Sequence, residues 1–265
     1  MSPPIITFLS DYGLEDDFVG VCHAVMFGAC PGARVIDLVH WVPRGDVRAG
    51  ALILSGALPY LPVGVHLAVI DPGVGSARRG VALRAADGRL LVGPDNGLLS
   101  LAAERAGGVV EAVDIGRSPF ALPTVSATFH GRDIFAPVAA RLAGGATLLD
   151  AGDACDPGGL VAIELPMARV EDGVLVAHVL HVDRFGNVQL NVEEPPFSVG
   201  AVVSLSTASR RSERARCVRT FADAGIGELI VYEDSYGWLA VAVNAGDAAA
   251  RLDVAVDDEL RIVFP

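Results

Sequence analysis

The sequence predicts two domains: an α/β domain with a mainly parallel sheet, followed by a smaller all-β domain of the barrel kind. Short apolar runs alternate with helix-like segments in the first half of the chain, which is the order of a parallel sheet covered by helices. Beyond about Leu165 only strand-like runs follow, separated by Gly, Asn and Asp. A length of 265 residues accommodates both domains. We therefore expect the α/β domain over residues 1–166 and the β-rich domain over residues 167–265.

The elements of the α/β domain can be assigned in chain order. Two helices are expected between the first strands, over residues 15–29 and 47–58, the second with Asp46 as its N-cap. A third is expected over residues 131–145, with Pro137 near its start and glycine at its end. The runs that predict strands are 5–10, 34–39, 65–70, "VALRA" and "RLLVG".

The strand-like stretches of the second domain are short and lie between turn residues. Because each stretch is apolar and ends at Gly, Asn or Asp, this half is expected to be mostly β, a small barrel or a sandwich. The stretches read "VLVAHVLHVDRFGNVQLNV", "AVVSLST", "ELIVYE", "WLAVAV" and "LRIVF".

Charge and composition restrict the partners. The formal net charge of −12 disfavours polyanions, so we expect a small-molecule ligand and neither nucleic acid nor an anionic membrane surface. The four cysteines are too far apart for a CxxC pair, and no signal peptide precedes Ile5, which favours the cytoplasm. Residues 51–70 carry no charge, but Pro59 and Pro62 interrupt them. A helix, a turn and a buried strand are therefore expected there, and no membrane span.

Two aspartates follow predicted strands and so lie at one rim of the expected sheet, where parallel sheets bind ligands. Asp11 could belong to a solvated loop that leads into a helix, recognise the hydroxyls of a ribose, or bind a metal ion. Asp71, in "VIDPGVGSARRG" (69–80), could serve an Asp-Pro-Gly turn or act chemically with Arg78 or Arg79.

Three further segments combine turn residues with side chains suited to recognition. His130 precedes Gly131 at a predicted helix start, where backbone N–H groups are free, although a lone histidine is also an ordinary structural residue. The segment "VDRFGNVQLN" (182–191) is either a hairpin turn or a planar base pocket made of an aromatic ring, an amide and a carboxylate. Residues 233–249 could likewise be an ordinary hairpin, with Ser235 at a turn.

Six segments together resemble the S-adenosylmethionine hydroxide adenosyltransferase family, to which the S-adenosylmethionine-dependent fluorinases and chlorinases are related. The resemblance implies an α/β domain, a β-rich domain, and a homotrimer with each active site between domains of neighbouring subunits. It also implies that water, as hydroxide, attacks the ribose C5′ of S-adenosylmethionine and releases adenosine and L-methionine, without metal or cofactor. The segments, in order over nearly the whole chain, are "FLSDYGLEDDFVG", "VIDPGVGSARRG", "VGPDNGLL", "TFHGRDIFAPVAA", "VDRFGNVQLN" and "DSYGWLAVAVNAGDAA".

The resemblance implies roles for individual residues. The Asp-Arg-His set of the family falls on Asp71, Arg78 and His130, with Arg79 as the alternative arginine. Asp11 would hold the ribose hydroxyls. The other residues implied in substrate binding are Gly131, Asp183, Phe185, Asn187, Ser235 and Ala245.

The nucleophile is expected to be water, not a halide. Halogenating relatives lack Asp71 and His130, fluorinases place a serine at the Gly131 position, and a carboxylate repels a halide ion. A sulfonium leaves as a neutral thioether, so only the water must be oriented or deprotonated. We expect Arg78 to lower the pKa of Asp71, so that the carboxylate orients the water. His130 then takes the proton, or Arg78 stabilises the developing hydroxide.

Three alternatives remain open at this point. The chain could be an S-adenosylmethionine-dependent halogenase that forms 5′-halo-adenosine, or an adenosine- or S-adenosylmethionine-binding protein without activity. It could also be a metal-dependent hydrolase. The ligands of such a metal would be drawn from Asp11, Asp16, Asp71, His130 and Asp133.

Overall fold

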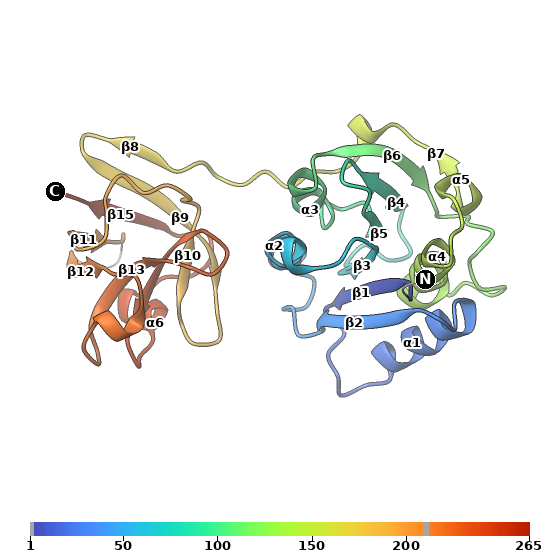
Figure 1. Cartoon of the computed structure of the whole chain (residues 1–265), viewed down its shortest axis with the longest axis horizontal. Helices are drawn as coiled ribbons and strands as arrows, with labels where there is room; N and C mark the ends of the chain where they lie inside the picture. Colours follow the sequence, from blue (N-terminus) through green and yellow to red (C-terminus); the bar gives the residue numbers. More distant parts are fainter. Residues whose placement is uncertain (1–2, 209–211) are drawn as a thin grey trace. The chain divides into compact units, whose positions relative to one another are not determined.

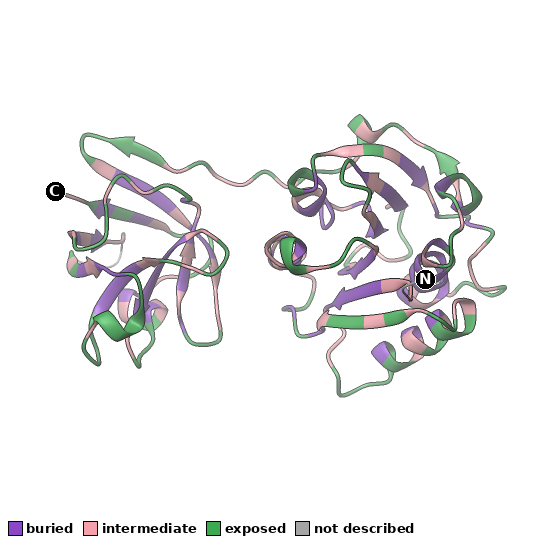
Figure 2. Cartoon of the chain, viewed as in Figure 1, coloured by how far each residue is buried: buried purple, intermediate pink, exposed green. Residues whose placement is uncertain are grey.

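The chain folds into two compact units, Met1–Ile163 and Glu164–Pro265 (Figure 1). The computed structural model describes residues 3–208 and 212–265. The division falls three residues before the expected boundary between residues 166 and 167. Each unit has its own buried apolar core, and buried residues are concentrated on the central strands of each (Figure 2).

A seven-stranded sheet forms the centre of the first unit, in the order β2-β1-β3-β5-β4-β6-β7. Five of the seven strands run in one direction, which confirms the α/β class. β4 runs antiparallel to both neighbours because only residues 86–89 separate it from β5, too few for a crossover helix. The strands are β1 (Ile5–Ser10), β2 (Arg34–Val39), β3 (Val65–Val69), β4 (Gly80–Ala85), β5 (Leu90–Pro94), β6 (Val109–Asp114) and β7 (Asp153–Ala154).

Helices cover both faces of this sheet. Phe8 and Leu9, adjacent in β1, belong to two different cores, since successive side chains of a strand point to opposite faces. α1 and α4 contribute to the core that contains Phe8, and α2 and α3 to the core that contains Leu9. The helices are α1 (Phe18–Ala29), α2 (Val47–Ala57), α3 (Ser100–Arg105), α4 (Ala136–Ala143) and α5 (Leu148–Ala151), with 3-10 turns at Leu58–Tyr60 and Pro157–Gly159.

Two of the three predicted helices need little correction. Asp46 caps α2 as expected, because its carboxylate accepts a 2.9 Å hydrogen bond from the backbone N–H of Ala49. α1 begins at Phe18 and not at residue 15. Residues 51–70 form the end of α2, a 3-10 turn and β3, as predicted. Within residues 3–208 and 212–265, every helix is too short or too polar to traverse a lipid bilayer.

The third predicted helix was wrong in its first turn. Gly131–Phe135 form a π-helical turn, in which the N–H of Ala136 donates to the carbonyl of Gly131, and α4 follows. Pro137 explains part of this change, because it has no N–H to donate back along the helix. The carbonyl of Asp133 instead accepts from the N–H of Leu122 at 2.8 Å.

The second unit is a closed barrel, as predicted. Seven strands follow one another in the order β10-β14-β13-β12-β11-β15-β9, and β9 pairs back onto β10, while β8 lies outside the ring on β9. Closure leaves the ring without an unpaired edge. The elements are β8 (Arg169–Glu171), β9 (Val174–Val182), β10 (Val188–Leu190), β11 (Val202–Ser206), β12 (Glu213–Cys217), β13 (Leu229–Glu233), β14 (Leu239–Val243), β15 (Glu259–Val263), a 3-10 turn (Phe221–Asp223) and α6 (Ala248–Leu252).

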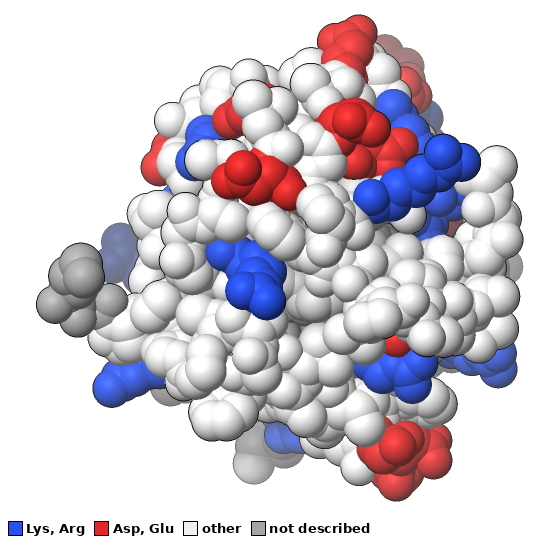
Figure 3. All heavy atoms as spheres, turned by 90° about the vertical axis from the view of Figure 1, so that its right-hand side faces the viewer, with Lys and Arg blue, Asp and Glu red and all other residues white. Residues whose placement is uncertain are grey.

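The charged side chains of the first unit are mixed in sign on the face drawn in Figure 3. Several acidic groups gather toward its upper part and another lies near its lower edge, with basic groups between them and uncharged side chains over most of the middle. A polyanion would therefore find no continuous basic surface on this face.

Candidate active site

The candidate site begins at the rim where β1 and β3 end. These strands pair in parallel with Ser10 opposite Val69, so the turns that follow them emerge at the same edge of the sheet. Asp11 and Asp71 are the residues at this edge, as the sequence predicts. Burial raises the pKa of the neighbouring Tyr12, and the charges of both aspartates add to the effect.

The loop after Asp71 folds back toward His130. The N–H of Val74 donates to the carbonyl of Asp71 at 3.1 Å, which closes the Asp-Pro-Gly turn. Gly75 has a φ of 77°, and a Cβ at this position would lie 2.4 Å from the carbonyl oxygen of Ala127. Glycine is therefore required where the loop packs against the segment that leads into His130.

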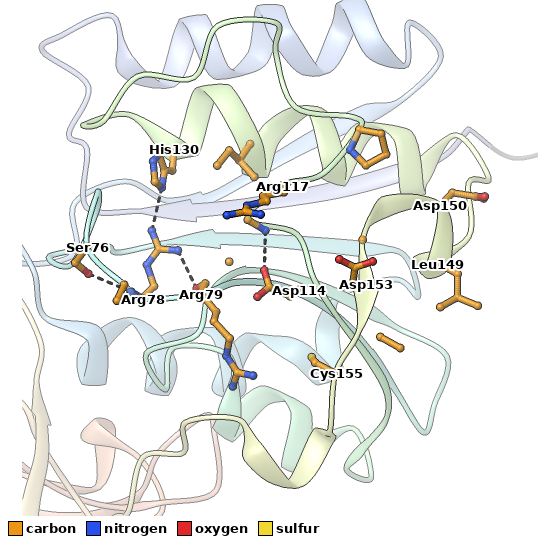
Figure 4. A pocket seen from close by; sticks show the side chains of 17 residues that line it. Ser76, Arg78, Arg79, Asp114, Arg117, His130, Leu149, Asp150, Asp153 and Cys155 are labelled. Atoms are coloured by element: carbon orange, nitrogen blue, oxygen red, sulfur yellow. Dashed lines mark hydrogen bonds between the residues drawn. The ribbon is translucent and has the colours of Figure 1, made fainter.

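This return of the chain brings together Asp71, Arg78 and His130. Arg78 donates to Asp71 from Nε (3.0 Å to Oδ1) and from Nη2 (2.5 Å to Oδ2), a two-point ion pair. The same Nη2 lies 3.3 Å from Nδ1 of His130 (Figure 4). The side chains of Arg78 and Asp71 are only 9% and 7% exposed, so the pair is shielded from water.

Arg79 faces away from this group. Its Nε and Nη2 donate to Asp95 Oδ2 at 3.0 and 2.5 Å, and Nη2 also donates to the carbonyl of Gly159. Asp95 accepts in addition from the N–H of Val161. Arg79 therefore fastens residues 157–161 to the sheet, and the geometry favours Arg78 over Arg79 as the arginine of the site.

The pKa of Asp71 differs from the expectation. Burial raises it above its ordinary value of 3.8, and the opposing effects of Arg78, by charge and by hydrogen bonding, do not reverse the shift. Arg78 acts in the predicted direction, but the prediction that the pKa of Asp71 lies below its ordinary value was wrong. Desolvation of the carboxylate outweighs the attraction of the neighbouring cation, which makes Asp71 a stronger base than an exposed aspartate.

The contact with Arg78 sets the state of His130. A guanidinium can only donate, so Nδ1 of His130 accepts the hydrogen bond and carries no proton. The neutral imidazole then has its proton on Nε2. In this arrangement His130 offers a donor, whereas each oxygen of Asp71 keeps a lone pair beyond the one that Arg78 uses.

Tyr12 is a residue of this site that sequence analysis did not single out. A Cβ built on Gly131 would lie 2.0 Å from the Tyr12 hydroxyl, so only glycine fits at this position. The ring packs edge-on against Phe8 and Phe129 and tilted against Phe18. No motif in a single sequence marks a tyrosine next to a conspicuous aspartate as part of a site.

Arg78 and His130 also line a pocket of about 880 Å³ (Figure 4). Other residues of its lining come from β4, β6 and β7 and from the segments that follow β6 and β7, and include Asp114, Arg117 and Cys155. Arg78 and His130, which are grouped with Asp71, are therefore accessible to a ligand in this pocket.

Asp11 is held in place by the backbone of a neighbouring loop. Its Oδ2 accepts from the N–H of Gly45 at 2.8 Å, and the N–H of Gly13 donates to the carbonyl of His40 at 2.6 Å. The second carboxylate oxygen of Asp11 stays available for a ligand, which suits the predicted contact with ribose hydroxyls.

The remaining predicted residues belong to the second unit. Asp183 accepts from the N–H groups of Phe185 (2.8 Å) and Asn187 (2.9 Å) and from the Asn187 amide (2.8 Å), so it closes the β9–β10 hairpin. This turn leaves Phe185 61% exposed. Ser235 lies in the turn after β13, and Ala245 follows β14 with a φ of 59°, a strained value for alanine. The hairpin interpretation thus holds, and the turn presents a ring and an amide.

Two of the acidic residues proposed as metal ligands are occupied in other ways. Asp71 pairs with Arg78, and the fully buried Asp133 accepts from Arg132 and from the N–H of Ser126. In the described part of the chain, no three His, Cys, Asp or Glu residues are grouped as metal ligands would be.

Comparison with known proteins identifies the family of the chain. Residues 6–152 match the family model of the SAM hydroxide adenosyltransferase N-terminal domain, and residues 177–261 match that of the C-terminal domain. The chain belongs to the SAM hydroxide adenosyltransferase family. The two matched segments of this adenosyltransferase family member lie one in each structural unit.

Relatives of this adenosyltransferase family member include named enzymes. It is 54% identical to a protein of Salinispora tropica named (R)-S-adenosyl-L-methionine hydrolase, over 99% of each chain. It is 31% identical to a fluorinase of an Actinoplanes species, over 93% of each chain. A crystal structure of an uncharacterized conserved protein from Thermotoga maritima superimposes with a TM-score of 0.90 at 36% identity, covering 97% of this chain and 99% of the other.

Proposed function

We propose that this chain hydrolyses (R)-S-adenosyl-L-methionine to adenosine and L-methionine. The observation that carries the proposal is the group formed by Asp71, Arg78 and His130 at the ligand-binding rim of the sheet. The name of the 54% identical relative supports S-adenosyl-L-methionine as the substrate, in its (R) configuration. The substrate is already activated as a sulfonium, so the reaction calls for no further cofactor.

In the proposed reaction the oxygen of water forms a bond to C5′ while the C5′–S bond breaks. The electron pair of that bond goes to sulfur, which leaves as the neutral thioether of methionine. Asp71 accepts the proton of the water, because its pKa is raised and its oxygens keep free lone pairs. The proton then passes to solvent, which restores the carboxylate.

The other two residues hold this base and the water in place. Arg78 fixes both oxygens of Asp71 and keeps a positive charge beside the oxygen that becomes hydroxide-like. His130, protonated on Nε2, donates to the water instead of accepting its proton. Of the two roles expected for His130 and Arg78, this geometry favours charge stabilisation by Arg78.

We propose that residues of the α/β domain and of the barrel domain both bind the substrate. Asp11 binds the ribose hydroxyls, with Gly131 beside the reacting carbon. The adenine and methionine parts are bound by Asp183, Phe185, Asn187, Ser235 and backbone near Ala245, in a homotrimer where a neighbouring subunit supplies these residues. The exposed Phe185 ring and the Asn187 amide suit an adenine base, by stacking and by hydrogen bonding.

We also propose a cytoplasmic location. All four cysteines have free thiols, which suits a reducing compartment.

The proposal is tested by incubating the purified protein separately with the (R) and (S) epimers of S-adenosylmethionine, with and without EDTA. We expect adenosine and L-methionine in equal amounts from the (R) epimer, at the same rate with the chelator. Adenosine no faster than in buffer would identify a binding protein without activity, and loss of turnover with EDTA would identify a metal-dependent hydrolase.

Halogenation is the second candidate, supported by the 31% identity to a fluorinase. The buried carboxylate of Asp71 argues against it, because a halide ion next to this group would be repelled. The lack of room for any side chain at position 131 also excludes a serine there while Tyr12 keeps its place.

A further inference from the structure

A chain of hydrogen bonds runs from the exposed Asp37 to the buried Ser10, which directly precedes Asp11. Oγ of Ser10 is 2.7 Å from Nδ1 of His40, and Nε2 of His40 is 2.9 Å from Oδ1 of Asp37. Ser10 is 0% exposed and His40 3% exposed. At the outer end, Nε2 of the partly exposed His23 also contacts Asp37, at 2.8 Å. The proposed reaction assigns no role to any of these residues.

The direction of each hydrogen bond follows from the donors available. Hydrogen bonds from His40 and His23 lower the pKa of Asp37 despite its partial burial, so this carboxylate is ionised and can only accept. His40 therefore donates from Nε2, and its Nδ1 must accept from the hydroxyl of Ser10. The oxygen of Ser10 is then free to accept from the N–H of Tyr12, which lies 3.3 Å away.

These bonds end at the turn that carries Asp11. The N–H of Tyr12, the residue after Asp11, donates to the hydroxyl oxygen of Ser10. The N–H of the next residue, Gly13, donates to the backbone carbonyl of His40 at 2.6 Å. The side chain and the backbone of His40 thus restrain both residues that follow Asp11 in the chain.

The arrangement has the order of a Ser-His-Asp catalytic triad but cannot act as one. Ser10 is fully buried, and its oxygen accepts from Tyr12 while its proton is donated to His40. A nucleophilic serine must reach the reacting carbon of the substrate. It also needs a general base that takes the hydroxyl proton as the serine attacks. Here the hydrogen bonds between these groups hold the backbone turn at Asp11 in place.

We propose that His40, linked to Asp37 and Ser10, is a positioning residue that orients Asp11 toward the ribose hydroxyls of the substrate. The inference rests on the proposed function, since it takes Asp11 as the ribose ligand. Ribose is bound equally in the substrate and in the transition state, so loss of this restraint raises KM and leaves kcat nearly unchanged.

The test compares Ser10→Ala and His40→Phe with wild type, using adenosine and 2′,3′-dideoxyadenosine as ligands in calorimetry. Ser10→Ala removes one small hydroxyl, and His40→Phe keeps a ring to pack against Phe8, 4.7 Å away between centroids. His23→Ala is the matched control, because it removes the exposed partner of Asp37 and leaves the chain to Ser10 intact. Asp37→Asn is the conservative variant, because its amide oxygen still accepts from His40.

We expect Ser10→Ala and His40→Phe to weaken adenosine binding, and to raise KM, by roughly five- to tenfold, the effect of about one hydrogen bond. Binding of dideoxyadenosine should change less than twofold, as should both ligands with His23→Ala and Asp37→Asn. Equal weakening of both nucleosides, or no weakening, would overturn the inference. A wild-type protein that binds adenosine but leaves S-adenosylmethionine intact would instead overturn the proposed hydrolysis, and the nucleoside comparison would still decide the role of His40.

Discussion

At the scale of single residues, two adjacent arginines have different tasks. Arg78 pairs with Asp71 and contacts His130, whereas Arg79 pairs with Asp95 on the way to residues 157–161. Their spacing along the chain cannot separate them, because each follows the same glycine-rich loop. The fold separates them, since consecutive side chains at a strand entry point to opposite sides.

Replacing each arginine by alanine provides a matched pair of variants. Arg78→Ala should lower kcat by roughly 100- to 1000-fold, since it removes the charge beside the developing hydroxide. Arg79→Ala should leave kcat nearly unchanged and lower the free energy of unfolding by about 1–3 kcal/mol, because it leaves Asp95 buried without its partner. Steady-state kinetics and urea unfolding measure the two effects. A larger loss of kcat in Arg79→Ala than in Arg78→Ala would show that Arg79, and not Arg78, is the arginine of the site.

The raised pKa of Asp71 predicts the acid side of the pH profile. If the carboxylate accepts the proton of water, kcat/KM falls as the pH drops through this pKa, which lies above the ordinary value of 3.8. Asp71→Asn should lose this pH dependence along with most of its activity. A pH series on both proteins measures it, and an acid limb that persists in Asp71→Asn would exclude Asp71 as the base.

At the scale of elements, the site depends on features that sequence patterns describe only in part. Strands β1 and β3 and the cap of α2 were predicted correctly because their apolar runs and capping residue are local signals. The π-helical turn at Gly131–Phe135 was not, since it depends on the missing N–H of Pro137 and on contacts with Leu122. Strand β12 was not predicted from the sequence, because charged residues interrupt its short apolar pattern, in which only Ala215 and Cys217 are buried.

The fit of this turn against Tyr12 is open to a double-mutant test. Gly131→Ala places a methyl group 2.0 Å from the tyrosine hydroxyl and should lower the free energy of unfolding by about 1–3 kcal/mol. Tyr12→Phe removes the oxygen, so the ring carbon at 3.1 Å becomes the nearest atom. The double variant should therefore recover part of the loss, measured by urea unfolding. Strictly additive effects would show that the two residues are not in contact.

At the scale of the whole molecule, sequence and structure agree on an α/β unit followed by a closed barrel. The predicted site residues are divided between the two, with Asp71, Arg78 and His130 in the first and Asp183, Phe185 and Asn187 in the second. Sequence indicated both groups through six motifs in family order, because each segment taken alone also fits an ordinary turn. It could not foresee that Tyr12 lies against Gly131, because that contact joins distant parts of the chain.

Complementation between inactive variants tests the proposed shared site. Asp71→Asn disables the residues of the first unit and Asn187→Ala those of the second. If neighbouring subunits share each site, co-expressing the two variants yields mixed trimers in which some sites have both groups intact. We expect activity well above that of either variant alone, in assemblies purified with two different tags. Activity no higher than the sum of the separate variants would place each site within one subunit.

The attack of water on C5′ can be followed through the origin of the 5′ oxygen of the adenosine formed. The protein is incubated with (R)-S-adenosyl-L-methionine in ¹⁸O-labelled water containing chloride and fluoride, and the products are analysed by mass spectrometry. We expect adenosine with one ¹⁸O atom at the 5′ position, formed together with L-methionine. Formation of 5′-chloro- or 5′-fluoro-adenosine, or of adenosine without the label, would contradict this attack by water.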